Sequence, residues 1–175
     1  MSAAPTSAAP TLAQVSLGDL AQELATTRRV LERVPDDRWD WKPHEKSMTL
    51  GQLAAHTANL LLWGEHTLTA SEVDFASPPP APPRHANRAA TLAAFDASVE
   101  QVRAGVGNAT DEALGATYTV RRGEQVMMAM PRVAMLRGFI LSHIIHHRGQ
   151  LSVYLRLLDV PVPSIYGPSA DEGRF

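Results

Sequence analysis

The stretch SHIIHHRGQLSVYLRLL, residues 142–158, ends a longer helical pattern that begins after Pro131. At about 100° per residue, His147 lies about 40° around the helix from His143, on the face that carries the apolar residues. The pattern therefore predicts an uninterrupted helix from Pro131 to Leu158 that turns His143 and His147 toward the core. The apolar residues of this face are Leu136, Ile140, Leu151, Tyr154 and Leu158.

Three more segments show helical spacing. The first has leucines at steps of three, four and seven, and Pro35 ends it. The second begins with Thr49 and Gln52, which have the spacing of a capping box. A proline-rich loop at residues 78–83 separates it from the third. Together with the fourth helix they predict an all-α four-helix bundle. The three predicted helices are residues 16–34, 49–70 and 87–106.

Two other segments have a recognisable character. Between residues 117 and 128, apolar residues alternate on both sides of Arg122 and Gly123, which is compatible with a short hairpin before the last helix. The connector at residues 35–47 contains Trp39 and Trp41, and we expect these rings to pack it against the bundle rather than line a pocket mouth.

Length and composition favour one domain and exclude several classes of protein. We predict a flexible tail at residues 1–11, made of Ala, Ser, Thr and Pro, and a single domain at residues 12–175. The tail has no basic residue and does not resemble a secretory signal, so we expect a cytoplasmic protein. The chain has no cysteine, and its net charge of −2 argues against nucleic-acid or anionic-membrane partners.

Three histidines on two predicted helices form the candidate metal site. On the second helix, His56 lies beside the apolar face that carries Leu53 and Leu60. On the fourth helix, His143 and His147 are four residues apart, which places their Cβ atoms about 6 Å from each other. This spacing lets both rings bind one ion. We therefore predict that one divalent metal ion is held by His56, His143 and His147.

Each polar residue of the fourth helix also has a simpler interpretation. A buried histidine is most often a neutral ring that is hydrogen-bonded to protein groups, and we favour that interpretation for any single one. For three histidines that converge on one core we favour a metal. We expect His146 and Arg148 to lie on a solvated face. Gln150 and Tyr154 could reach the site, but we favour packing and internal hydrogen bonds for both.

Three neutral nitrogen ligands would leave at least one coordination position open, as in catalytic rather than structural zinc sites. An ion in such a site can lower the pKa of bound water to about 7 and deprotonates a bound thiol. Imidazole ligands suit nickel, copper and zinc, whereas magnesium and calcium prefer oxygen. The sequence does not separate zinc from nickel.

The segments VPDDRWDWKPHEKSMTLGQLAAH (34–56) and HIIHHRGQLSVYLRLLDVPVPSIYGPSADE (143–172) resemble the DinB family, within the DinB/YfiT-like superfamily. The resemblance implies a four-helix bundle with a nickel or zinc ion on one histidine of the second helix and an HxxxH pair of the fourth, commonly in a homodimer. Those positions correspond to His56, His143 and His147. Some superfamily members are thiol-dependent enzymes, such as bacillithiol S-transferases and mycothiol-dependent maleylpyruvate isomerases, and many have no assigned activity.

Two functions stay open at this point, and no catalytic residue is assigned. The first is a metal-dependent hydrolase or thiol S-transferase in stress or detoxification, which transfers water or a small-molecule substrate such as a low-molecular-weight thiol to a small electrophile. The second is a non-catalytic metal-binding or interaction protein whose ion stabilises the bundle. The family name reflects induction by DNA damage and does not imply contact with DNA, which the net charge also disfavours.

Overall fold

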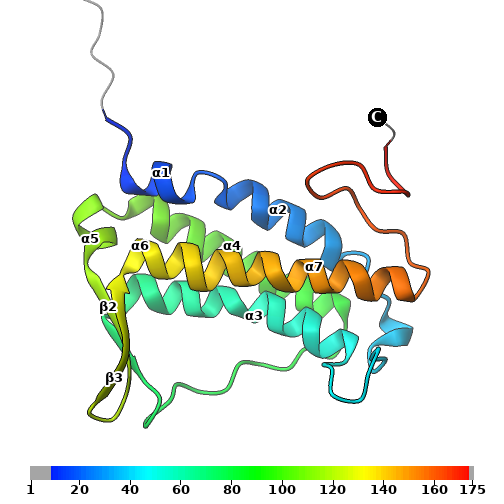
Figure 1. Cartoon of the computed structure of the whole chain (residues 1–175), viewed down its shortest axis with the longest axis horizontal. Coiled ribbons are helices and arrows are strands. Elements are labelled where there is room, and N and C mark those ends of the chain that lie inside the picture. Colours follow the sequence, from blue (N-terminus) through cyan, green and yellow to red (C-terminus); the bar gives the residue numbers. More distant parts are fainter. Residues whose placement is uncertain (1–8, 174–175) are drawn as a thin grey trace, which may run out of the picture.

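Figure 1 shows the computed structural model, which describes residues 9–173, as four long helices with a small sheet at one end. All four long helices expected from the sequence are present. Among the described residues, none of the helices is both long and apolar enough to span a bilayer. The long helices are α2 (Leu20–Leu31), α3 (Leu50–Thr69), α4 (Arg88–Asn108) and a continuous run of α6 (Arg132–Met135), η2 (Leu136–Leu141) and α7 (Ser142–Leu157). Three short helices complete the chain: α1 (Leu12–Leu17), η1 (Asp36–Arg38) and α5 (Asp111–Gly115).

The helices α1 and α3 each begin with a capping box. The backbone N–H of Gln52 donates to Thr49 Oγ1 at 3.2 Å, and the side chain of Gln52 accepts from the Thr49 N–H at 2.9 Å. Thr11 and Gln14 form the same reciprocal pair at the start of α1. The flexible tail predicted for residues 1–11 thus ends in a residue that caps a helix. Residues 1–8 of that prediction lie outside the described part of the chain.

The predicted fold class, all-α, is wrong, because the chain also forms a three-stranded mixed sheet. The hairpin expected before the last helix is present as β2 (Thr117–Arg122) and β3 (Gln125–Pro131), which pair antiparallel. The strand β1 (Glu72–Asp74) then adds to β2 in the parallel direction. The protein is therefore mostly helical, with a small sheet that the sequence indicated only in part.

The sequence of β1 shows no hydrophobic period. A side chain of a distant strand holds β1 in place instead. Of its residues only Val73 is buried. Arg121 on β2 forms salt bridges of 2.7 Å with both Glu72 and Asp74. The Asp74 carboxylate also accepts from the backbone N–H of Gly123 at 2.8 Å, at the hairpin turn. Gly123 has a φ of +60°, which glycine adopts without strain.

The fourth helix is not the uninterrupted α-helix that was predicted, because η2 is π-helical. A π turn bonds residue i to i+5, so positions before and after it are no longer related by 100° per residue. The buried face of α7 consequently lies further round than the periodicity suggested, and His143 at its border is only half-buried. The buried residues of α7 are Ile144, His147, Arg148, Leu151 and Leu155.

Two neighbouring residues of α7 differ in how well they were predicted. His146 is exposed, as expected. The prediction that Arg148 is solvated is wrong, since its side chain is 1% exposed and forms a 2.7 Å salt bridge with Glu23 on α2. Its other guanidinium nitrogen donates to the hydroxyl of Tyr166 at 2.7 Å, which attaches the C-terminal segment to the bundle. Arg148 was misjudged because the sequence does not show which distant residue neutralises it.

The connector before α3 packs against the bundle through its two tryptophans, as predicted, but Trp39 also lines a cavity beside α3, which was not expected. A Cβ atom on Gly51 would lie 2.3 Å from the indole of Trp39, so this ring covers the first turn of α3 directly. Trp41 meets the ring of Tyr154 edge to face, with centroids 5.7 Å apart. The Tyr154 hydroxyl donates to the carbonyl of Met48 at 3.3 Å. Tyr154 is therefore a packing residue on the connector side of α7.

Candidate metal centre

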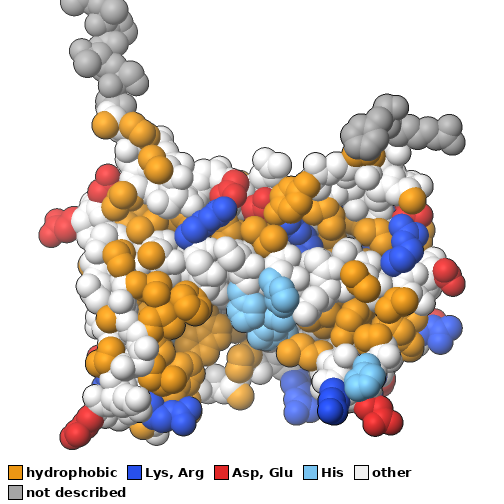
Figure 2. All heavy atoms as spheres, viewed as in Figure 1, with side chains coloured by type: hydrophobic (Ala, Val, Ile, Leu, Met, Phe, Trp, Pro, Cys, Tyr) orange, Lys and Arg blue, Asp and Glu red, His pale blue; other side chains and the backbone are white. Residues whose placement is uncertain are grey.

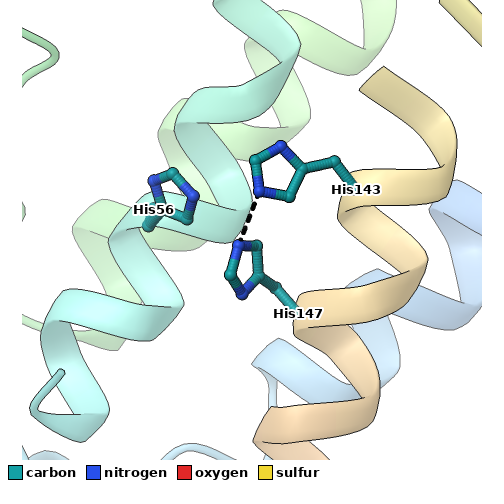
Figure 3. Close-up of side chains that lie close together, drawn as sticks. All are labelled: His56, His143 and His147. Carbon is teal, nitrogen blue, oxygen red and sulfur yellow. Dashed lines mark hydrogen bonds between the residues drawn. The ribbon is translucent and has the colours of Figure 1, made fainter. Parts of the chain in front are cut away.

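The three predicted histidines meet between α3 and α7, as Figure 3 shows. His56 projects from α3, and His143 and His147 project from α7 one turn apart. Each ring offers one nitrogen, and the three nitrogens lie within 4.8 Å of one another. The Nε2 atoms of His143 and His147 are 2.8 Å apart. The structure thus brings together side chains that are separated by almost ninety positions in the chain.

Gln150 fixes the orientation of one ring. Nδ1 of His147 lies 2.7 Å from Oε1 of Gln150, one turn further along α7. An amide oxygen only accepts, so His147 carries its proton on Nδ1 and directs the lone pair of Nε2 toward His56 and His143. Such an outer hydrogen bond is the usual way in which proteins hold a metal-ligating histidine. Gln150 is therefore a positioning residue rather than one buried within the core.

The surroundings keep these rings neutral, which is the form that binds metal. Burial lowers the pKa of His147 to about 4; the Gln150 hydrogen bond acts the other way, and the neighbouring histidines add to the lowering. Burial and then His143 lower the pKa of His56. Burial and then His146 lower the pKa of His143, against a hydrogen bond to the backbone carbonyl of Phe139.

The donor set suits a divalent ion that accepts nitrogen ligands, such as zinc. With metal–nitrogen distances of about 2.0–2.1 Å, two ligands at a tetrahedral angle stand roughly 3.3 Å apart. The Nε2 atoms of His143 and His147 are 2.8 Å apart, and the three nitrogens lie within 4.8 Å of one another, so the rings would have to turn for one ion to reach all three. Three neutral imidazoles suit zinc and nickel better than magnesium or calcium, which prefer oxygen ligands.

His146 lies next to the centre without belonging to it. Its ring centroid is 4.9 Å from that of His147 and 6.5 Å from that of His143. It is exposed, and its ring is not one of the three that converge. The expectation that His143 and His147 are the pair on this helix agrees with this geometry.

Comparison with known proteins places the chain in a family. The sequence model described as DinB family matches residues 10–174, almost the whole chain. This chain belongs to the DinB family. A relative in sequence is the uncharacterized protein YrdA of Bacillus subtilis, which is 28% identical over 154 residues and matches 86% of this chain and 85% of its own length.

Solved DinB-like proteins have the same fold. A DinB-like protein, YjoA, from Bacillus subtilis superposes with a TM-score of 0.64 at 17% identity, covering 91% of this chain and 99% of that one. A DinB-like protein from Bacillus cereus gives 0.62 at 21% identity, covering 86% and 95%. A protein from Exiguobacterium sibiricum assigned to the DinB family gives 0.59 at 19%, covering 87% and 95%. At these identities the likeness concerns the fold.

In this DinB-family chain the centre lies at the surface, and Figure 2 shows histidine side chains exposed on this face between apolar side chains. Two cavities meet at His56. One, of about 350 Å³, is polar and includes Gln52, Asn59, Arg84 and His85 in its lining. The other, of about 320 Å³, is mainly apolar and reaches both His56 and His143. The centre is thus open to small molecules from two sides.

Sequence reasoning missed the residues of the polar cavity. Arg84 and His85 follow the proline-rich loop, whose composition predicts only an extended chain. Asn59, buried on α3, holds this loop against the helix. Its amide nitrogen donates to the carbonyl of Pro83 at 2.8 Å, and its Oδ1 lies 3.0 Å from Nε2 of His85. A polar residue one turn beyond His56 in an apolar helix was the available signal.

Proposed function

We propose that this DinB-family protein is a metal-dependent enzyme, a hydrolase or thiol S-transferase that acts on a small electrophile in stress or detoxification. The observation that carries the proposal is the position of the three neutral imidazoles at the surface, where two cavities of different polarity meet. Purely structural zinc sites are enclosed by four protein ligands, whereas catalytic sites keep one position accessible.

The residues have separate tasks in this proposal. His56, His143 and His147 would hold the ion, and Gln150 would keep His147 in the tautomer that binds it. A divalent ion held there would supply Lewis acidity and lower the pKa of a water or thiol ligand toward neutrality. Arg84 in the polar cavity carries a positive charge that suits the anionic groups of a hydrophilic co-substrate, such as a low-molecular-weight thiol.

Nickel and zinc are the ions that we propose, because both accept three imidazoles with a further position open. We further propose a cytoplasmic homodimer, which the family resemblance suggests and which sedimentation of the purified protein tests.

A second function follows from where the ligands originate. His56 belongs to α3, and the other two histidines belong to α7, so an ion would cross-link two helices of the bundle. In that role the ion contributes folding stability and the protein is a non-catalytic metal-binding or interaction protein.

One set of measurements separates the two functions. The metal content of the purified chain is determined first, and consumption of a thiol with a model electrophile is then followed. We expect His147→Ala to lose metal and turnover while retaining its helical circular dichroism, and His146→Ala to keep both. A metal-loaded wild-type chain without turnover, whose unfolding midpoint drops sharply on chelation, would favour the non-catalytic function. Equal metal loss in the two variants would refute the ligand assignment.

A further inference from the structure

The apolar cavity beside the histidines has a lining without ionised side chains. It lies between α3, the sheet and η2, and its volume is about 320 Å³. His56 and His143 line the cavity where it meets the histidine centre. Among the described residues that line it, none is Asp, Glu, Lys or Arg. Its lining includes Trp63, Thr67, Phe75, Tyr118, Met128 and Phe139.

The hydroxyl groups in the lining already have partners. Thr67 Oγ1 donates to the carbonyl of Trp63 at 2.8 Å. The Tyr118 hydroxyl lies 2.7 Å from Nδ1 of His66. A polar molecule that entered the cavity would lose its hydrogen bonds to water and find few replacements away from the histidines. Burying a polar group without replacement hydrogen bonds costs free energy, so the lining selects against such molecules.

The rim keeps large apolar side chains at the surface. Phe75 is 39% exposed and Phe139 is 46% exposed, although both rings lie at the mouth of a cavity whose wall is apolar. Figure 2 shows apolar side chains gathered beside the histidines toward the end of the bundle that carries the sheet. Met128 adds an unbranched, polarizable side chain that adapts to ligands of different shape.

The dimensions limit the ligand to a small molecule. A volume of about 320 Å³ equals that of roughly ten waters at about 30 Å³ each. This is at the lower end of the range of about 300–1,000 Å³ for small-molecule sites. The polar cavity on the other side of His56 differs in character, because Asp40, Arg84 and His85 line it.

We propose that the apolar cavity binds the electrophilic substrate, and that this substrate is a neutral, largely apolar molecule such as an aromatic compound with its reactive end at His56 and His143. This inference rests on the proposed function and adds to it the chemical class of the substrate and the place where it binds. A polar co-substrate would then bind in the polar cavity on the other side of His56.

Binding of a neutral fluorescent probe, N-phenyl-1-naphthylamine, to the full-length metal-loaded chain tests the proposal without any need for turnover. Met128→Glu introduces a charge into the cavity wall. Met127→Glu is the matched control, because Met127 directly precedes Met128 on β3. Its side chain is 56% exposed and does not line the cavity. Val120 faces Met128 and Arg121 faces Val126 in the ladder, so Met127 is the extra residue of a β-bulge. We expect Met128→Glu to weaken probe binding about tenfold or more, and Met127→Glu to leave it within about twofold.

Two further measurements complete the test. Phe139→Glu should weaken binding in the same way and replaces Met128→Glu if that variant loses its circular dichroism. The neutral 1-naphthylmethanol should displace the probe, and the cation 1-naphthylmethylammonium, which has no lone pair on nitrogen to bind the metal ion, should not. Equal binding by both glutamate variants of β3, or equal displacement by the cation, would overturn the proposal. So would sedimentation showing that Met128→Glu converts a dimer to a monomer, since a second copy would then occupy the cavity.

The two proposals fail in different ways. His147 does not line the apolar cavity, so His147→Ala should abolish turnover while probe binding persists. Absence of turnover together with probe binding that Met128→Glu weakens would reject the enzyme and keep the apolar site. Turnover, together with probe binding that is equally strong in Met128→Glu and in the wild-type chain, would reject the apolar site alone.

Discussion

Replacing Arg148 by methionine should be among the most destabilising single changes in this chain. The substitution keeps a long unbranched side chain but removes the partner of Glu23, whose carboxylate is itself buried at 5% exposure. Tyr166 then remains as the side-chain partner of that carboxylate, 3.0 Å away. Removing one member of a buried ion pair costs about 3–5 kcal/mol, because the other charge is left without compensation. For a chain of this size that corresponds to a fall of roughly 10 °C in melting temperature.

Urea unfolding followed by circular dichroism measures this loss, and two variants test its cause. Arg148→Met combined with Glu23→Leu should recover most of the stability, because no charge is then left buried. Arg156→Met is the control on the same helix, because Arg156 pairs with Asp171 while 49% exposed, and should cost below about 1 kcal/mol. A cost for Arg148→Met no greater than the control, or a double variant no better than the single one, would refute the reasoning.

Three further predictions concern the centre and its supports. Gln150→Leu should weaken metal binding about tenfold in a chelator competition, and Gln150→Glu should not, because glutamate keeps the acceptor for Nδ1 of His147. Gly51→Ala should lower the free energy of unfolding by about 1–3 kcal/mol, since its Cβ would meet the Trp39 ring at 2.3 Å. Hydrogen bonds from Gly123 and Ala76 and the charge of Arg121 lower the pKa of Asp74, so its contribution to stability is present above the ordinary value of 3.8 and is lost as pH falls further. Acid titration of unfolding should accordingly show a smaller loss in Asp74→Asn.

Helical periodicity was sufficient to select the three histidines, because His56 and the pair on α7 each lie on or beside an apolar face. It was not sufficient to place that face. The π turn in η2 changes the angular position of every residue after it around the helix axis. The sequence of residues 136–141 carries no pattern that predicts this turn. The sequence therefore predicted a centre deep in the bundle, whereas His143 lies half-buried at its surface.

Contacts between distant residues account for the other differences. From helical periodicity alone, Arg148 is assigned to the solvent-exposed face because it is charged. Its burial depends on Glu23, which is 125 positions away. β1 likewise contacts a distant residue, since Glu72 and Asp74 both form salt bridges with the Arg121 guanidinium. Side-chain pairs of this kind become visible only once the fold is known.

The π-helical segment also lets the fourth helix hold one residue more than an ordinary α-helix over the same span. A π turn bonds residue i to i+5, so removing one residue from 136–141 would let it relax to an α-helix and leave the histidines downstream facing as they do now. Adding one residue instead would swing them by about 100° relative to the hairpin end. Among related sequences, a one-residue gap between the hairpin and the first histidine of α7 should therefore be tolerated, and a one-residue insertion should be rare.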